Sequence, residues 1–193
     1  PALKAMVPIV PFNNAHEVMY SGGAYQLALS MGWGSAVSGI QMDPTKIKLE
    51  EAFKYLPLKT WDDCLGHEIF YLRDWIAHPT YDDYWKQRGI DHRYADIAVP
   101  ILNIGGWYDI FSKATIEMIT RVRQESRNVA VRRNQFAILG PWTHGVNNEK
   151  VGELEFSNAK LDLGDRQFQW FEFWLKGKDT PVTDWPPYYL YVM

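Results

Sequence analysis

Two segments decide the fold: VPILNIGGWYD at residues 99–109 and QFAILGPWTHG at residues 135–145. In each, an apolar run of strand length leads into glycine and tryptophan and then into a side chain suited to proton chemistry, Asp109 in the first and His144 in the second. Residues 112–126, which lie between them, carry apolar side chains at helical spacing. Strands that alternate with a helix predict a mostly parallel sheet in an α/β fold.

Asp109 and His144 are candidate catalytic residues. The carboxyl ends of parallel strands meet at one edge of a sheet, and ligand sites form there. A carboxylate that holds an imidazole is the arrangement used to activate a serine nucleophile, in the chain order Ser…Asp…His. Two plainer roles remain open, because Asp109 directly precedes a helix that it can cap and His144 lies in a loop.

No nucleophile is evident. A serine nucleophile needs a sharp strand-to-helix turn with small residues around it, and none of the seven serines has that context, although Ser38 comes nearest. Cys64 is a poor alternative because nothing near it in the sequence supplies an activating group. We therefore expect the chain to be a piece of a longer protein, whose serine precedes a strand at residues 3–10.

Composition excludes several classes of function. The net charge of -3 and the pI near 6.0 give no reason to expect nucleic acid or an anionic membrane as a partner. No apolar run approaches the roughly 18 residues of a transmembrane helix. The histidines form no regular liganding motif. A metal site could be drawn from His78, Asp82, Asp83 and His92, but their spacing is not specific to metal binding. We expect neither a metal nor an organic cofactor.

Other segments suggest the domain organisation. One long segment is rich in signals for the start of a helix, which suggests a helical insertion. A later helix is rich in aromatic residues and ends before Gly177, because glycine is the usual residue just past the end of a helix. The predicted segments are a core part at 1–29, a helical cap insertion at 30–95 with capping signals at 43–44, 60–63 and 80–83, a second core part at 96–180 with the helix 165–176, and a strand at 186–193 that opens a new domain within 181–193.

The chain resembles the cocaine-esterase-like and X-prolyl dipeptidyl-peptidase family of α/β-hydrolases, which also contains glutaryl and cephalosporin acylases and α-amino acid ester hydrolases. The resemblance spans nearly the whole chain in the right order. Its matching motifs are PALKAMVP at 1–8, YDDYW at 81–85, residues 100–109, GPWTHG at 140–145 and WFEFWLKG at 170–177.

The resemblance implies the C-terminal half of an α/β-hydrolase sheet, interrupted by a helical cap and ending where a jelly-roll domain begins. Asp109 is then the orienting acid and His144 the general base, while Trp107 and Trp142 are candidate walls of the substrate pocket. Packing of the loops that hold Asp109 and His144 is an equally open role for both tryptophans. The implied substrate is a small ester, an amide or a short peptide, and the present chain without its serine should be inactive.

Two other functions remain open at this stage. The chain can be a non-catalytic member of the same fold, a binding or scaffold protein that keeps its loops for packing. A carbohydrate-binding module rich in aromatic residues is disfavoured by the α/β alternation. The particular substrate, the cellular location and the oligomeric state are not determined by the sequence.

Overall fold

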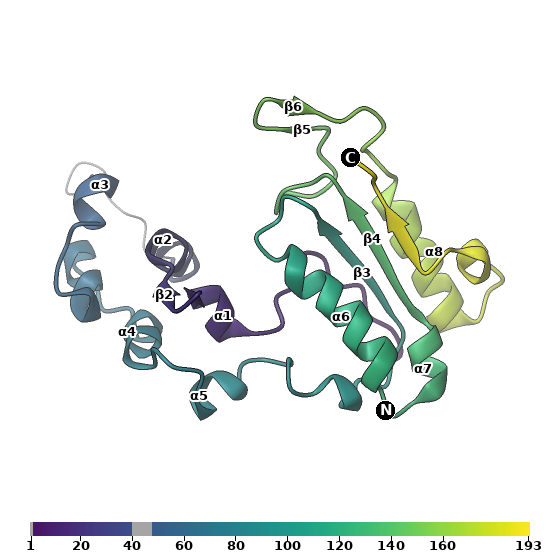
Figure 1. Cartoon of the computed structure of the whole chain (residues 1–193), viewed down its shortest axis with the longest axis horizontal. Coiled ribbons are helices and arrows are strands. Elements are labelled where there is room, and N and C mark those ends of the chain that lie inside the picture. The colour runs from purple at the N-terminus through teal and green to yellow at the C-terminus, as the bar shows by residue number, and fades with distance from the viewer. Residues whose placement is uncertain (1, 40–47) are drawn as a thin grey trace. The chain divides into compact units, whose positions relative to one another are not determined.

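The chain folds into an α/β unit, residues 1–13 with 90–193, and a helical unit, residues 14–89. Both are shown in Figure 1. The computed structural model describes residues 2–39 and 48–193. The α/β class predicted from the sequence is confirmed by the parallel sheet of the first unit.

A three-stranded parallel sheet in the order β3–β4–β7 forms the centre of the α/β unit. Figure 1 shows α6 on one face of this sheet and α8 on the other. The elements of the unit, in chain order, are η2 (Tyr94–Asp96), β3 (Ile101–Gly106), α6 (Ser112–Glu125), α7 (Val129–Arg133), β4 (Gln135–Gly140), β5 (Lys150–Val151), β6 (Leu154–Glu155), α8 (Leu163–Lys176), η3 (Pro181–Asp184) and β7 (Tyr188–Leu190).

Alternating side chains bury both faces of the sheet. On one face, Leu102 and Ile138 pack with Trp170 of α8. On the other, Ala137 and Leu139 pack with Ile119 of α6. Strands buried on both faces read as continuous apolar runs, which is why β3 and β4 stand out in the sequence.

Two helix predictions are confirmed. The helix expected at 112–126 is α6, and the aromatic-rich helix is α8. Gly177 follows α8 with φ 64°, the left-handed conformation that glycine adopts without strain. Apolar spacing and end signals therefore located both helices.

The segment at residues 3–10 differs from the strand that its sequence predicts. It runs parallel to β3 but pairs with it only through isolated bridges, Met6 with Ile101 and Ile9 with Ile104. Pro8 lacks the N–H that a regular ladder needs, and Val10 has a positive φ of 46°. The result is an irregular segment along the outer edge of β3.

The last strand joins the same sheet. Tyr188–Leu190 pairs in parallel with β4 from Ala137 to Leu139. This edge of β4 offers backbone groups that need partners, and residues 181–193 fall within the α/β unit. The jelly-roll domain inferred from the resemblance stays a prediction.

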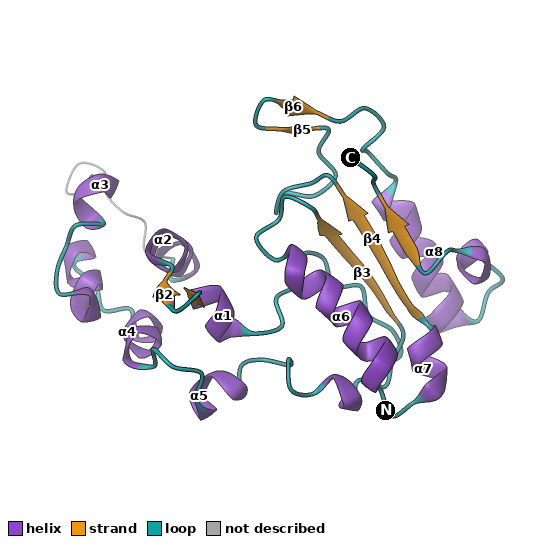
Figure 2. Cartoon of the chain, in the orientation of Figure 1, coloured by secondary structure: helices purple, strands orange, loops and turns teal. Residues whose placement is uncertain are grey.

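Short helices make up most of the second unit (Figure 2). They pack around a core that includes Met31, Trp61, Leu72 and Trp85. Its elements are α1 (Ala15–Met19), β1 (Tyr20–Ser21), β2 (Ala24–Tyr25), α2 (Leu27–Val37), α3 (Leu49–Ala52), η1 (Leu58–Leu65), α4 (Phe70–Ala77) and α5 (Asp83–Lys86). Asp82 caps α5 by accepting a hydrogen bond from the Tyr84 N–H. The capping signal at 43–44 lies outside the described residues.

The boundaries of this helical unit differ from the predicted insertion at 30–95. Residues 14–29 belong to it because Met19 and Tyr20 enter its core. Residues 90–95 belong to the α/β unit, where Tyr94 packs with Ile101 and Met118.

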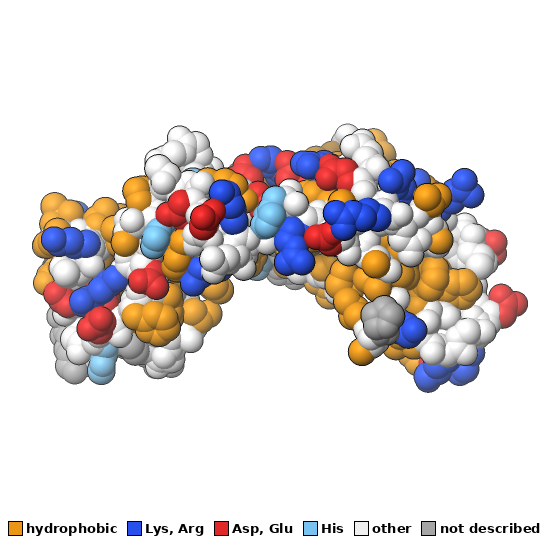
Figure 3. Space-filling model, turned by 90° about the horizontal axis from the view of Figure 1, so that it is seen from below, with side chains coloured by type: hydrophobic (Ala, Val, Ile, Leu, Met, Phe, Trp, Pro, Cys, Tyr) orange, Lys and Arg blue, Asp and Glu red, His pale blue; other side chains and the backbone are white. Residues whose placement is uncertain are grey.

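Acidic and basic side chains are interspersed over the face seen in Figure 3, in keeping with the small net charge. Across residues 2–39 and 48–193, no helix combines the length and the apolar character that a bilayer crossing requires.

Glu172 gives α8 a pH-dependent contribution to stability. Its buried carboxylate pairs with Lys176 and Lys178, and hydrogen bonds from these two ammonium groups hold its pKa below the usual range. A carboxyl whose pKa is depressed by folding stabilises the fold above its unfolded pKa of about 4.3 and loses that contribution as the pH falls through the folded value. We predict that melting temperatures fall less between about pH 5 and pH 3 in Glu172→Gln than in the wild type.

Circular dichroism at a series of pH values measures this difference. Glu153→Gln, at an exposed position of the same unit, is the control and should keep the wild-type pH dependence. Identical curves for the wild type and Glu172→Gln would contradict the prediction.

Candidate active site

The two candidate catalytic residues leave the sheet side by side. In the β3–β4 pair Gly106 lies opposite Gly140, the last residue of each strand. Asp109 follows the first glycine by three residues and His144 follows the second by four. In-register parallel pairing thus places both loops at the carboxyl edge of the sheet, where α/β proteins form ligand sites.

Asp109 and His144 are joined by a hydrogen bond. The distance between Nδ1 of His144 and Oδ1 of Asp109 is 2.9 Å. The Asp109 side chain is fully buried, whereas 56% of the His144 side chain is exposed. A carboxylate only accepts hydrogen bonds, so its partner Nδ1 is assigned the proton of a neutral His144. Nε2, which has no hydrogen-bond partner among the described residues, then carries the free lone pair.

Backbone hydrogen bonds hold the two loops against each other. The N–H of Trp107 donates to the Gly140 carbonyl at 2.9 Å, and the N–H of Tyr108 donates to the Trp142 carbonyl at 3.0 Å. This approach is so close that a Cβ on Gly106 would lie 2.0 Å from the Trp142 carbonyl oxygen. The glycines before each loop are therefore needed for contact between the loops.

Trp142 lies in the core and not at a surface. Its side chain is fully buried, and its indole N–H donates to the Ala159 carbonyl at 3.1 Å. A Cβ on Gly140 would lie 2.1 Å from its ring. This burial favours the other role left open for Trp142, packing beneath the His144 loop.

Trp107 is half-buried and packs beside Ile119 and Leu139. Its indole N–H donates to the Tyr191 carbonyl at 2.9 Å, which ties the Asp109 loop to the residues that follow β7. Packing is the role that these contacts support for Trp107.

One phenylalanine that the sequence analysis missed lies beside the imidazole, and a second packs against the first. Phe111 presents a ring edge-on to His144, with 5.2 Å between centroids and an interplanar angle of 86°. Phe12 contacts Phe111 at 5.8 Å and is 44% exposed. The position of Phe111 two residues after Asp109 was an available signal, whereas Phe12 is far away in sequence.

Asn147 fixes the far side of the His144 loop. Its side chain donates to the Leu161 carbonyl at 2.9 Å and accepts from the Leu161 N–H at 2.8 Å. Asn147 has a positive φ of 63°, a conformation that asparagine tolerates better than most residues. The loop is thus held at both ends.

The other candidates have different partners. Nδ1 of His78 lies 2.6 Å from Asp82, while Asp83 pairs with Lys86 and His92 with Asp91. No cluster of three or more metal-ligating side chains occurs in the part of the chain that the structure describes. Burial raises the pKa of the Cys64 thiol, which disfavours the reactive thiolate.

The parallel sheet with helices on both faces, and the Asp–His pair at its carboxyl edge, define an α/β protein with a candidate active site. The family described as X-Pro dipeptidyl-peptidase (S15 family) matches residues 1–146. The chain belongs to this family.

Individual relatives agree with this placement. The chain is 22% identical over 216 residues to cocaine esterase from Rhodococcus sp. (strain MB1 Bresler), covering 99% of this chain and 36% of that protein. The structure is similar to an aminopeptidase from the marine sediment archaeon Thaumarchaeota archaeon, with a TM-score of 0.75, 22% identity and coverage of 99% and 33%. An α-amino acid ester hydrolase gives a TM-score of 0.69, 20% identity and coverage of 99% and 33%. The chain thus spans about a third of the length of these relatives.

Substitution of Gly106 tests the close approach of the two loops. We predict that Gly106→Ala lowers the free energy of unfolding by about 1–3 kcal/mol or more, because the added methyl group meets a backbone carbonyl that cannot rotate away. Chemical denaturation measures the loss, and the Nδ1–H resonance of His144 should disappear or shift.

Gly164→Ala is the matched control. A Cβ at Gly164 comes no nearer than 3.4 Å to another group, at the start of α8. This variant should change stability by less than about 1 kcal/mol. Equal stabilities of the two variants would show that the loops have room to separate.

Proposed function

We propose that the chain carries the acid and the base of a serine hydrolase that cleaves an ester or an amide. The observation that carries this proposal is the 2.9 Å hydrogen bond from His144 to the buried Asp109, with Nε2 of the exposed imidazole free for a substrate or nucleophile. Membership in a peptidase family and the esterase among the relatives agree with it.

In the proposed reaction, Nε2 of His144 accepts the proton of a serine hydroxyl while the serine oxygen attacks the acyl carbonyl. The resulting imidazolium gives that proton to the leaving alcohol or amine as the bond to the acyl carbon breaks. Water then attacks the acyl carbon of the acyl-enzyme while His144 accepts one of its protons. The bond between the acyl carbon and the serine oxygen breaks, His144 returns the proton to that oxygen, and the acid product leaves. Asp109 keeps the proton on Nδ1 and stabilises the imidazolium.

The burial of Asp109 suits this role. Its Oδ2 is buried and has no hydrogen-bond partner among the described residues. The charge of the carboxylate is therefore compensated mainly through His144, and this interaction strengthens when the imidazole becomes positive.

We further propose that the nucleophilic serine comes from a part of the protein outside these 193 residues. None of the described serines forms a hydrogen bond with His144, and Ser126, for example, donates to the Ile97 carbonyl instead. The three relatives are about three times as long as the part that this chain matches, which leaves room for such a segment in a protein of their size.

The substrate class is proposed at the level of an ester, an amide or a short peptide. The relatives include an esterase and an aminopeptidase. Their names support cleavage of an ester bond and of a peptide bond alike. Phe111 lies beside the imidazole and Phe12 packs against Phe111. We assign these two phenylalanines, in place of Trp107 and Trp142, to contact with an apolar group of the substrate. The roles of residues 14–89 as a cap and of a jelly-roll domain are part of the same proposal.

Replacing the acid tests the proposed mechanism in the longer gene product that supplies a serine. Asp109→Asn keeps the size of the side chain but favours the wrong tautomer of His144, so kcat for an activated aryl ester should fall by about 10³–10⁴-fold. Asp184→Asn, which alters an exposed carboxyl group, should keep wild-type kcat. An Asp109→Asn enzyme within a factor of two of the wild type would refute the assignment and favour a non-catalytic member of the fold.

The chain by itself should not hydrolyse esters. We predict no turnover of p-nitrophenyl acetate above the buffer rate for the 193-residue protein, because no serine is available to His144. Turnover that is lost in His144→Ala would show that a group within these residues serves as nucleophile.

A further inference from the structure

A cavity lies at the other end of the sheet from Asp109 and His144. It has a volume of about 470 Å³, within the usual range for small-molecule sites. It is lined at the start of β4 by Asn134 and Phe136, and also by Arg123 of α6 and Arg133 of α7. The catalytic residues follow the opposite ends of β3 and β4, so this cavity is separate from the proposed active site.

The lining combines positive charge with aromatic surface. Arg123 and Arg133 are among its lining residues, and no Asp or Glu of the described part of the chain lines the cavity. Its aromatic walls are Phe136, Phe173, Trp174 and Trp185. This composition suits a ligand that has both an anionic group and a flat apolar body.

Arg123 is held in place, and Arg133 is available for a ligand. Arg123 donates from Nη1 to the Gln135 carbonyl at 3.1 Å and lies 5.7 Å from the Tyr188 ring centroid. Arg133 has no ion pair or side-chain hydrogen bond with the described residues and is exposed. The neighbouring Arg132, by contrast, donates to the Ser126 carbonyl at 2.6 Å. One arginine held by the protein and one without a protein partner thus line a cavity whose described lining holds no carboxylate.

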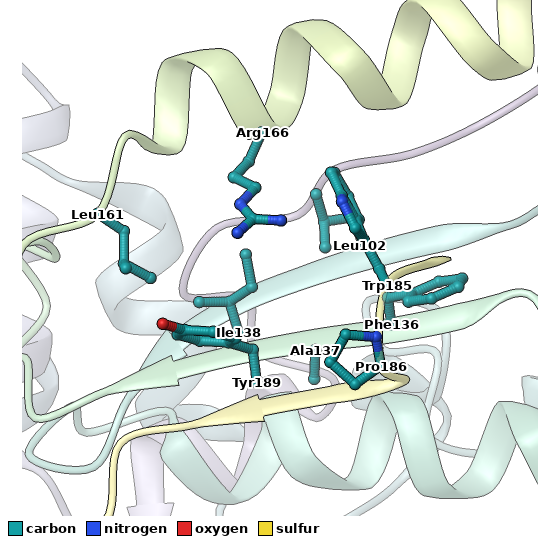
Figure 4. A pocket seen from close by; sticks show the side chains of 9 residues that line it. All are labelled: Leu102, Phe136, Ala137, Ile138, Leu161, Arg166, Trp185, Pro186 and Tyr189. Carbon is teal, nitrogen blue, oxygen red and sulfur yellow. The ribbon is translucent and has the colours of Figure 1, made fainter. Parts of the chain in front are cut away.

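A third arginine adds to the positive surroundings. Phe136 and Trp185 also line a smaller cavity, on whose far wall Arg166 extends from α8 (Figure 4). The Arg166 guanidinium carbon lies 4.9 Å from the Trp185 ring centroid. The acidic residues near it in sequence have other partners, since Asp162 accepts from the Asp165 N–H and Asp165 accepts from Gln169. Trp185 therefore lines both cavities and has the Arg166 guanidinium near its ring.

We propose that this cavity, formed by Arg123, Arg133, Trp174 and Trp185, binds a small anionic ligand with a planar aromatic body. The anionic group lies between the two guanidinium groups, and the ring packs on the tryptophans. A carboxylate and a phosphate both present oxygen acceptors to arginine. The anionic group of the ligand can therefore come from an aryl carboxylate or an aryl phosphate, and the experiment distinguishes these two sources.

Titration of the protein with three matched probes tests this site. Benzoate and phenyl phosphate are anionic, and benzamide is the neutral control of similar shape. We expect at least one anion to bind about ten-fold or more tightly than benzamide, with chemical-shift changes at the indole N–H groups of Trp174 and Trp185 and a weaker affinity at high salt. The tighter of the two anions identifies the source.

Arg133→Gln should remove most of the preference for the anion. This side chain is exposed and without a protein partner, so the variant should fold even where Arg123→Gln does not. Arg127→Gln, an exposed arginine of the same unit that pairs with Asp96 outside the cavity, should bind like the wild type. Equal affinities for benzoate, phenyl phosphate and benzamide, shifts confined to His144 and Phe111, or unchanged binding in Arg133→Gln would overturn the proposal. None of these outcomes depends on hydrolysis, so the site and the proposed activity fail or survive separately.

Discussion

The hydrogen bond between His144 and Asp109 depends on one constraint, the in-register pairing of β3 with β4. A shift of one residue would move the two loops apart by about 3.3 Å and would turn the buried side chains toward the wrong faces. Leu102 and Ile138 on one face, and Ala137 and Leu139 on the other, oppose such a shift because each is buried against a helix. Core packing therefore sets the geometry of the site.

Two glycines and a buried tryptophan allow the loops that follow the paired strands to contact each other. Gly106 and Gly140 allow the backbone after β3 to reach the Trp142 carbonyl, and the Trp142 ring fills the space that a side chain at Gly140 would occupy. The conspicuous tryptophan of the His144 loop thus contributes rigidity. The aromatic neighbour of the imidazole is Phe111, which in turn packs against Phe12.

The two ends of β4 lie in different chemical surroundings. At the carboxyl ends, a buried carboxylate orients an exposed imidazole. At the start of β4, two arginines and several aromatic rings surround a cavity without acidic groups. The proposed acyl-transfer site needs a neutral base that can take a proton. The proposed anion site needs permanent cations, and arginine remains charged at any physiological pH.

The sequence by itself determined the α/β class, the helices α6 and α8, and the pairing partners Asp109 and His144. These features follow from local signals, namely apolar runs of strand length, helical spacing, and glycines where two backbones must meet. Tertiary structure decided what lies beside these features. It buried Trp142, brought Phe12 next to Phe111, reduced the pairing of residues 3–10 to isolated bridges and joined Tyr188–Leu190 to β4. These outcomes depend on contacts between residues far apart in the chain, and no periodicity within a single segment encodes them.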